Sequence, residues 1–91
     1  MTTARGEFVV RNRLGLHARA AAKLTQAASK FPCEVTVSRD GQTANAKSVM
    51  GVLLLCGAQG TTLSVQATGD LAEEAVRAVG ELIDDLFGEG E

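Results

Sequence analysis

Three short segments of this chain alternate apolar and polar residues, and this period of two constrains the fold more than any other feature. The segments are GEFVVRN at 6–12, CEVTVSR at 33–39 and TTLSVQA at 61–67. Successive side chains of a β-strand point to opposite faces, so each segment predicts a strand with one buried face. Strands of this kind form an antiparallel sheet with one packed and one polar face. The positions predicted to face the core are Phe8, Val10, Val35, Val37, Leu63, Val65 and Ala67.

A fourth strand is predicted by the turn that follows the second segment. The pair Asp40-Gly41 is a strong two-residue hairpin signal. It predicts that the chain turns back on itself and continues as a short strand over about Gln42 to Ala46.

Two helices are predicted between the strands. The first covers HARAAAKLTQAASKF at 17–31 and ends before Pro32. The second is short, from Ser48, which suits a helix N-cap, to about Leu55. The apolar face of the first helix, at helical spacing, consists of Ala20, Ala21, Leu24, Ala28 and Phe31.

The last helix has the clearest pattern. Asp70 with Glu73 three residues later indicates a capped start, and Gly88 indicates the end. The stripe predicted to cover the sheet consists of Leu71, Ala75, Val79, Leu82 and Leu86.

The predicted element order is βαββαβα. An α+β open-faced β-sandwich, in which three helices cover one face of a four-stranded antiparallel sheet, buries all of these apolar faces at once. We therefore expect a single domain over residues 1–91, because so short a chain supports only one core. One stripe is what the last helix needs to cover the sheet, so we expect a monomer.

Composition excludes several classes of function. The net charge is −2 and the chain has no Trp or Tyr, which argues against nucleic acid as a partner. The longest apolar run, VLLLC at 52–56, is too short to cross a bilayer, and MTTARGEF is not a signal peptide. We expect a cytoplasmic protein that does not enter a membrane. Cys33 and Cys56 are then expected to be reduced packing residues.

The only histidine, His17, stands where the first helix should begin, a place that Ser, Thr, Asp or Asn usually occupies. A helix N-terminus has unpaired amides and a partial positive charge, and so attracts phosphate. Gly15 leaves room for a group to approach, and Arg19 adds a permanent cation. The sequence thus predicts that His17 carries a phosphoryl group, contacted by the helix start at Ala18 and Arg19. The alternative is a histidine that only caps the helix or lies on the surface.

Other chemistries lack the necessary residues. A single His without an evident carboxylate partner completes neither a Ser-His-Asp site nor a Cys-His site, and a metal site would lack ligands. GQTANAKS at 41–48 nearly matches the P-loop pattern, but Ala46 stands where the second Gly is required. We expect neither a metal nor a cofactor.

Two motifs carry a resemblance to a known family. GLHARAAA at 15–22 and AKSVMGVLLL at 46–55, within the βαββαβα order, resemble the HPr family, the histidine phosphocarriers of the bacterial phosphotransferase system. The resemblance implies that His17 accepts a phosphoryl group on Nδ1 from phosphorylated enzyme I, which phosphoenolpyruvate charges, and passes it to an EIIA-type acceptor. It implies that Arg19 assists. Such a carrier is a phosphoryl-transfer intermediate rather than an enzyme with its own turnover.

The second motif implies regulation and docking. In the family, the serine that matches Ser48 is a site for an HPr kinase/phosphorylase in many bacteria, and a phosphate there would weaken docking to acidic partners. Val52 and Leu55 suit the core. The predicted docking patch, next to Arg19, consists of Leu16, Ala20, Val49, Met50 and Leu53. The alternative function is an HPr-like regulatory module that acts only by docking and is modulated at Ser48.

One position departs from the pattern of the sugar-pathway carriers. They usually have Pro after the Arg, whereas Ala20 follows Arg19 here. The stretches GLHARAAAK and FPCEV look more similar to the nitrogen-related NPr branch.

Overall fold

The computed structural model describes residues 2–88, and its sheet has the strand order β1-β4-β2-β3, antiparallel throughout. The strands are β1 (Thr3–Val9), β2 (Glu34–Arg39), β3 (Gln42–Asn45) and β4 (Thr62–Thr68). The helices are α1 (Ala18–Ser29), α2 (Val49–Leu53) and α3 (Ala72–Asp84), followed by a 3-10 turn over Leu86–Gly88. The predicted βαββαβα order and the open-faced α+β architecture are confirmed.

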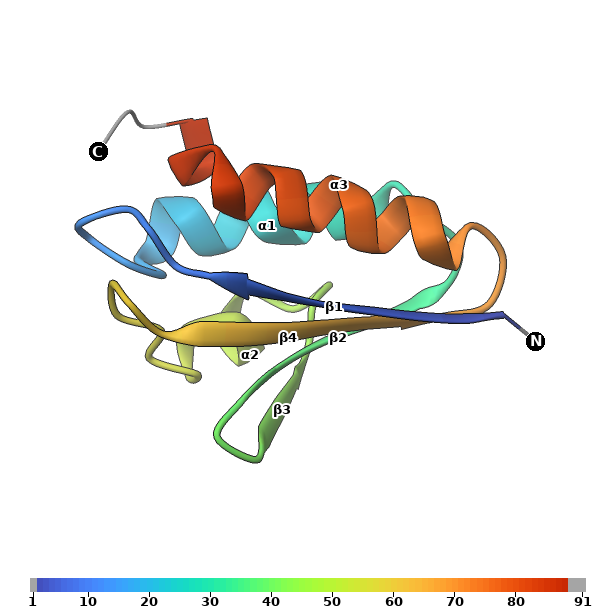
Figure 1. The fold of residues 1–91 in the computed structure, drawn as a ribbon, viewed down its shortest axis with the longest axis horizontal. Helices are drawn as coiled ribbons and strands as arrows, with labels where there is room; N and C mark the ends of the chain where they lie inside the picture. The colour runs from blue at the N-terminus through green and yellow to red at the C-terminus, as the bar shows by residue number, and fades with distance from the viewer. Residues whose placement is uncertain (1, 89–91) are drawn as a thin grey trace.

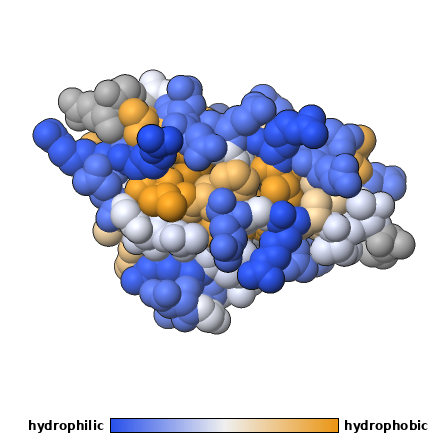
Figure 2. Space-filling view, viewed as in Figure 1, coloured by the Kyte–Doolittle hydropathy of each residue, from blue (hydrophilic) through white to orange (hydrophobic). Residues whose placement is uncertain are grey.

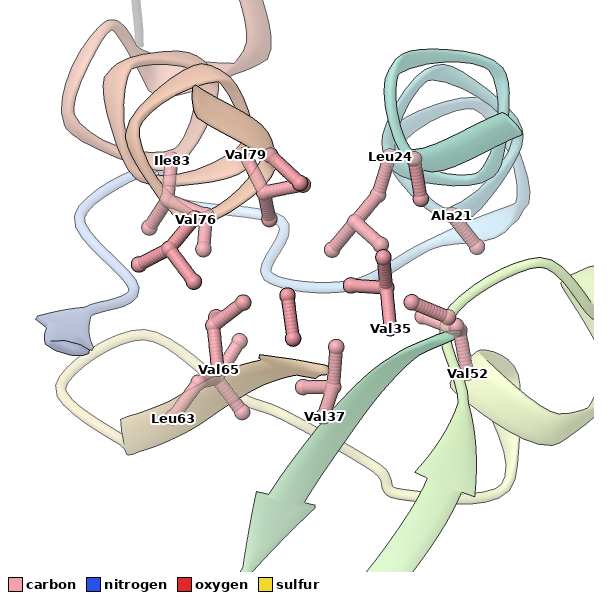
Figure 3. Packing of buried hydrophobic residues seen from close by; sticks show 14 of the residues in the cluster. Ala21, Leu24, Val35, Val37, Val52, Leu63, Val65, Val76, Val79 and Ile83 are labelled. Carbon is pink, nitrogen blue, oxygen red and sulfur yellow. The ribbon is translucent and has the colours of Figure 1, made fainter. Parts of the chain in front are cut away.

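The helices α1 and α3 lie side by side over one face of the sheet (Figure 1). The short helix α2 contacts α1 and β3. The side chains of Leu24 on α1 and of Val76 and Val79 on α3 point toward those of the strands (Figure 3). Because burial of a side chain such as Val contributes about 1.5 to 3 kcal/mol, these facing rows supply much of the stability. The alternating strand residues predicted for the core are buried, except Phe8, which is half-buried.

Phe8 closes the gap between the edge strand β1 and α3. Its ring lies against Gly6 and Gly80, where an added Cβ would clash with ring atoms. In Figure 2 an apolar band is visible between α3 and the sheet edge, with hydrophilic residues on both sides. The glycine on α3 therefore lets helix and strand approach each other around the ring.

The β2–β3 hairpin turns at Asp40 and Gly41 as predicted. Both residues have positive φ, 47° and 84°, which is the backbone of a type I′ turn. Thr36 to Arg39 then pair with Asn45 to Gln42, so the edge strand β3 ends one residue before the predicted Ala46.

The start of α3 differs from the prediction. Asp70 is not the N-cap: the helix begins after Leu71, which has φ 65° and makes no side-chain cap bond. Leu71 is also half-exposed rather than part of the buried stripe. The left-handed residue rotates the chain as it enters the helix, so that Ala72 takes the buried position.

The end of α3 differs as well. The α-helix stops at Asp84 instead of reaching Gly88, because Leu86 and Phe87 have positive φ. This change of direction buries Phe87, while Leu86 stays half-buried. The Phe87 carbonyl accepts a 2.7 Å hydrogen bond from Lys23 Nζ of α1. The two helices are therefore tied together at this end.

Candidate functional site

His17 is the N-cap residue of α1. Its backbone is extended, with φ −76° and ψ 176°, and its Nδ1 accepts a hydrogen bond of 3.2 Å from the Arg19 amide. An imidazole nitrogen thus replaces the oxygen that a Ser or Asp cap would supply. Nδ1 accepts this bond through its lone pair, whereas Nε2 is buried. The lone pair that can act as a nucleophile is therefore held at the helix N-terminus.

The first turn of α1 leaves its positive end uncompensated. It contains no acidic residue, and Arg19 adds an exposed guanidinium to the same turn. The partial charge at a helix N-terminus, about +0.5, acts within the first turn. An anion attached to His17 Nδ1 would lie next to backbone amides and beside a permanent cation.

The turn before His17 depends on Gly15, but not in the way the sequence predicts. Gly15 has φ 65°, and an added Cβ would lie 2.5 Å from the Gly57 carbonyl oxygen. The missing side chain therefore makes room for Gly57 rather than for an incoming group. The Leu16 amide donates to the same Gly57 oxygen at 2.8 Å, which joins this turn to the loop after α2.

Ser48 caps α2 as predicted. Its Oγ accepts a hydrogen bond of 3.2 Å from the Gly51 amide, and its backbone is extended. The side chain is half-buried, and α2 contacts α1. The Ser48 hydroxyl thus lies at the start of α2, and α2 contacts α1, the helix that begins after His17.

The sequence comparisons agree with these two motifs. The family model described as the PTS HPr component phosphorylation site matches residues 4–85. The chain belongs to the HPr family. This family carries phosphoryl groups in the phosphotransferase system on a phosphorylation-site histidine.

Several HPr proteins are close in sequence or structure. The phosphocarrier protein HPr of Xylella fastidiosa is 48% identical over 83 residues, which are 91% of this chain and 93% of the relative. The crystal structure of HPr-C-His from Thermoanaerobacter tengcongensis superposes with a TM-score of 0.91 at 42% identity, covering 94% of this chain and 97% of that one.

The phosphocarrier protein NPr of Shewanella violacea is 39% identical over 89 residues, which are 98% of each chain. Since the HPr relatives have the higher identity, the comparisons favour HPr over the predicted NPr branch.

The predicted docking residues of this HPr family member divide into two groups. Val49 and Met50 are 38% and 66% exposed, and Leu53 is half-buried. Leu16 and Ala20, at 6% and 0% exposure, belong to the core, so their inclusion in an exposed patch is wrong. The reason is geometric: both point inward from the turn and first helical turn that carry His17.

The structure adds exposed apolar residues that the sequence analysis did not single out. Leu54 at the end of α2 is 70% exposed and Leu14 is 65% exposed. Val52 and Leu55 are buried as predicted. We define the α2 patch as Val49, Met50 and Leu54, because all three are exposed and lie on or beside one helix.

Lys47, the lysine of the near P-loop match, has a structural role. Its Nζ donates to the backbone carbonyls of Phe31 at 2.7 Å and of Cys33 at 2.8 Å. Lys47 thus fixes the backbone segment between α1 and β2, which agrees with the rejection of a P-loop at residues 41–48. Cys33 is a buried free thiol as predicted, whereas Cys56 is exposed, so the expectation that both cysteines are packing residues is wrong for Cys56.

Within residues 2–88, no group of three or more His, Cys, Asp or Glu side chains is arranged to hold a metal ion. In the same range no helix is long and apolar enough to cross a membrane.

Asn12 is the site residue that the sequence analysis missed. It is 0% exposed, and among the described residues it is the one polar or charged residue that is buried. Its Nδ2 donates to the Gly15 carbonyl at 2.8 Å. Asn at the first and Gly at the fourth position of a turn is a known signal, and it could have found Asn12, which the period-two pattern assigned to the end of the first strand.

Proposed function

We propose that His17 carries the phosphoryl group of this HPr protein on Nδ1. The Nδ1 lone pair attacks phosphorus as the bond between phosphorus and the donor breaks. In the second transfer a nucleophile of the acceptor attacks phosphorus as the Nδ1–P bond breaks, which returns the lone pair to Nδ1. The observation that carries this proposal is the position of Nδ1 at the uncompensated start of α1.

Phosphorylation changes the partner of the Arg19 amide. The single Nδ1 lone pair cannot hold both the amide proton and phosphorus, so the Arg19 N–H is released from Nδ1. A phosphoryl oxygen then becomes the nearest acceptor for that amide. The cap bond of the free carrier is thereby replaced by an amide–phosphate bond in the phosphorylated one.

The size of this stabilisation suits a relay. An anion near a helix N-terminus gains about 0.3 to 1 kcal/mol when exposed, and up to about 2 when partly buried. An exposed Arg adds less than about 1 kcal/mol. A total of a few kcal/mol holds the group between two partners without trapping it.

Membership of the family implies enzyme I as donor and EIIA-type proteins as acceptors. We assign the α2 patch, with Leu53 and the exposed Arg19, to docking of both partners. Met is suited to a surface that must fit more than one partner. The buried stripe of α3 packs against the sheet, which supports a monomer. Membership of the HPr family implies that it works in the cytoplasm.

Ser48 is the candidate for regulation by an HPr kinase/phosphorylase. Its Oγ lies at the start of α2, next to Val49 and Met50 of the α2 patch. A phosphate there adds a charge of about −1.5 to −2 beside an apolar docking surface. The alternative function, a module that acts by docking alone, rests on this same surface.

The test is phosphorylation of the purified protein by phosphoenolpyruvate and an active enzyme I. Intact mass and acid lability report the product, and His17→Ala is the matched variant. We expect one acid-labile phosphoryl group on the wild type and none on His17→Ala. An unlabelled wild type would favour the docking module.

Docking is tested separately with Met50→Glu. Because Met50 is largely exposed, this variant should fold normally by circular dichroism. It should be phosphorylated more slowly by enzyme I, and an unchanged rate would remove Met50 from the docking surface.

A further inference from the structure

The turn that precedes α1 contains a buried amide side chain that takes no part in phosphoryl transfer as described above. We infer that Asn12 is a positioning residue: it holds His17 Nδ1 at the helix N-terminus by fixing the Gly15 carbonyl. This inference rests on the proposed role of His17.

The hydrogen bonds of the turn meet at one atom. The Gly15 carbonyl oxygen accepts from Asn12 Nδ2 at 2.8 Å and from the His17 amide at 2.9 Å. The Gly15 amide in turn donates to the Asn12 carbonyl oxygen at 3.2 Å. The side chain of Asn12 and the backbone of His17 are therefore connected through a single acceptor.

The opposite side of the turn is closed by Gly57. The Gly57 carbonyl oxygen accepts from the Leu16 amide at 2.8 Å, and a Cβ added to Gly15 would lie 2.5 Å from it. An added Cβ on Gly57 would itself lie 2.7 Å from Leu16 Cδ1. The turn is thus held between Asn12 on one side and Gly57 on the other, with no space for it to shift toward Gly57.

The burial of Asn12 indicates that its hydrogen bond to the Gly15 carbonyl, and not only its volume, is needed in this turn. A fully buried amide is costly unless its polar groups have partners, so its presence in a small core calls for a reason. An apolar side chain could fill the same volume but would not orient the Gly15 carbonyl. Since a misplacement of about 1 Å can slow a transfer by about a hundredfold, orientation of this turn affects the rate directly.

The experiment compares two variants at Asn12 with a control in the core. Asn12→Ala removes the side chain, and Asn12→Asp keeps its shape but loses the N–H donors. Val79→Ala on α3 removes buried volume in the core without changing any residue of the turn. Each protein is phosphorylated by enzyme I below its thermal midpoint, and the Arg19 amide and the His17 ring nitrogens are followed by NMR.

We expect both Asn12 variants to be phosphorylated about tenfold to a hundredfold more slowly than the wild type, with shifted Arg19 amide and His17 Nδ1 resonances. Val79→Ala should retain both the rate and these resonances. If Asn12→Ala is unfolded at the working temperature, Asn12→Asp decides, because it preserves the volume.

A wild-type rate and wild-type resonances in Asn12→Asp would overturn the inference. So would an equal loss of rate in Val79→Ala, because the effect would then be one of general stability. Failure of the proposed function looks different: the wild type itself would remain unlabelled by an active enzyme I. The resonances of Arg19 and His17 would still report whether Asn12 positions the ring.

Discussion

The two long helices of this HPr protein begin in opposite ways. The helix α1 starts at His17, which makes a side-chain cap bond, and its first turn has no acidic residue. The helix α3 starts after Leu71, which makes no cap bond, and its first turn contains Glu73 and Glu74. In α3, acidic side chains of the chain itself offset the positive helix end.

The difference indicates which helix end is available for an external anion. At α3 the positive end is already balanced by two carboxylates. At α1 no acidic side chain of the first turn offsets it, so under the proposed function this end is available to the phosphoryl group. The short helix α2 is a third case, since Ser48 caps it with a hydroxyl that is itself a candidate for phosphorylation.

An acidic residue in the first turn of α1 should remove the difference between the two helix starts and have the largest effect on phosphorylation. Ala18 is exposed, so Ala18→Glu places a carboxylate there without disturbing the core. We expect phosphorylation by enzyme I to slow by about tenfold, which corresponds to about 1.4 kcal/mol of repulsion between carboxylate and phosphoryl group.

The same variant should unfold at an equal or slightly higher temperature, because a carboxylate at a helix N-terminus stabilises the helix. Ala18→Gln is the matched control for size. If Glu and Gln give the same rate, the electrostatic account of the site is wrong.

The cap of α2 supplies the next effect in size. Ser48→Ala removes the acceptor for the Gly51 amide and should lower the free energy of unfolding by about 0.5 to 2 kcal/mol. Denaturant titration measures this loss. Ser48→Asp retains an acceptor at the cap, so it should recover most of the stability, and a variant as unstable as Ser48→Ala would contradict the capping role.

The complementary test removes the carboxylates from the first turn of α3. The double variant Glu73→Gln and Glu74→Gln should lower the free energy of unfolding by about 0.3 to 1 kcal/mol per charge at low salt. The loss should shrink as salt is added. Phosphorylation of His17 should keep its wild-type rate, and a marked change in that rate would mean that α3 acts on the site.

The smallest effect is expected at Asp70, which the sequence pattern proposes as a cap and the structure does not. Because Asp70 is exposed and makes no cap bond, Asp70→Ala should change the free energy of unfolding by less than about 0.5 kcal/mol. A thermal melt of both proteins is sufficient. A loss of about 1 kcal/mol or more would restore Asp70 as a cap.

The elements of the fold were largely predictable because they depend on local patterns. The period-two strands, the Asp40-Gly41 turn and the Ser48 cap each need only a few neighbouring residues to specify them. The two ends of α3 were not predictable in this way. Leu71, Leu86 and Phe87 adopt left-handed backbone that their residue types disfavour. This backbone accompanies the burial of Ala72 and Phe87 in the core, which depends on tertiary packing rather than on neighbouring residues.

The candidate site likewise has some features that neighbouring residues specify and others that depend on packing. Neighbouring residues alone specify that one histidine begins a helix, with an arginine two residues later and no acid in the first turn. The burial of Leu16, Ala20 and Asn12 and the approach of Gly57 to Gly15 depend instead on how distant segments pack. The contacts of Gly15 and Leu16 with Gly57 join segments more than forty residues apart in the chain, so no local pattern encodes them. The Asn12–Gly15 hydrogen bond spans only three residues, and what the fold adds to it is the burial of Asn12.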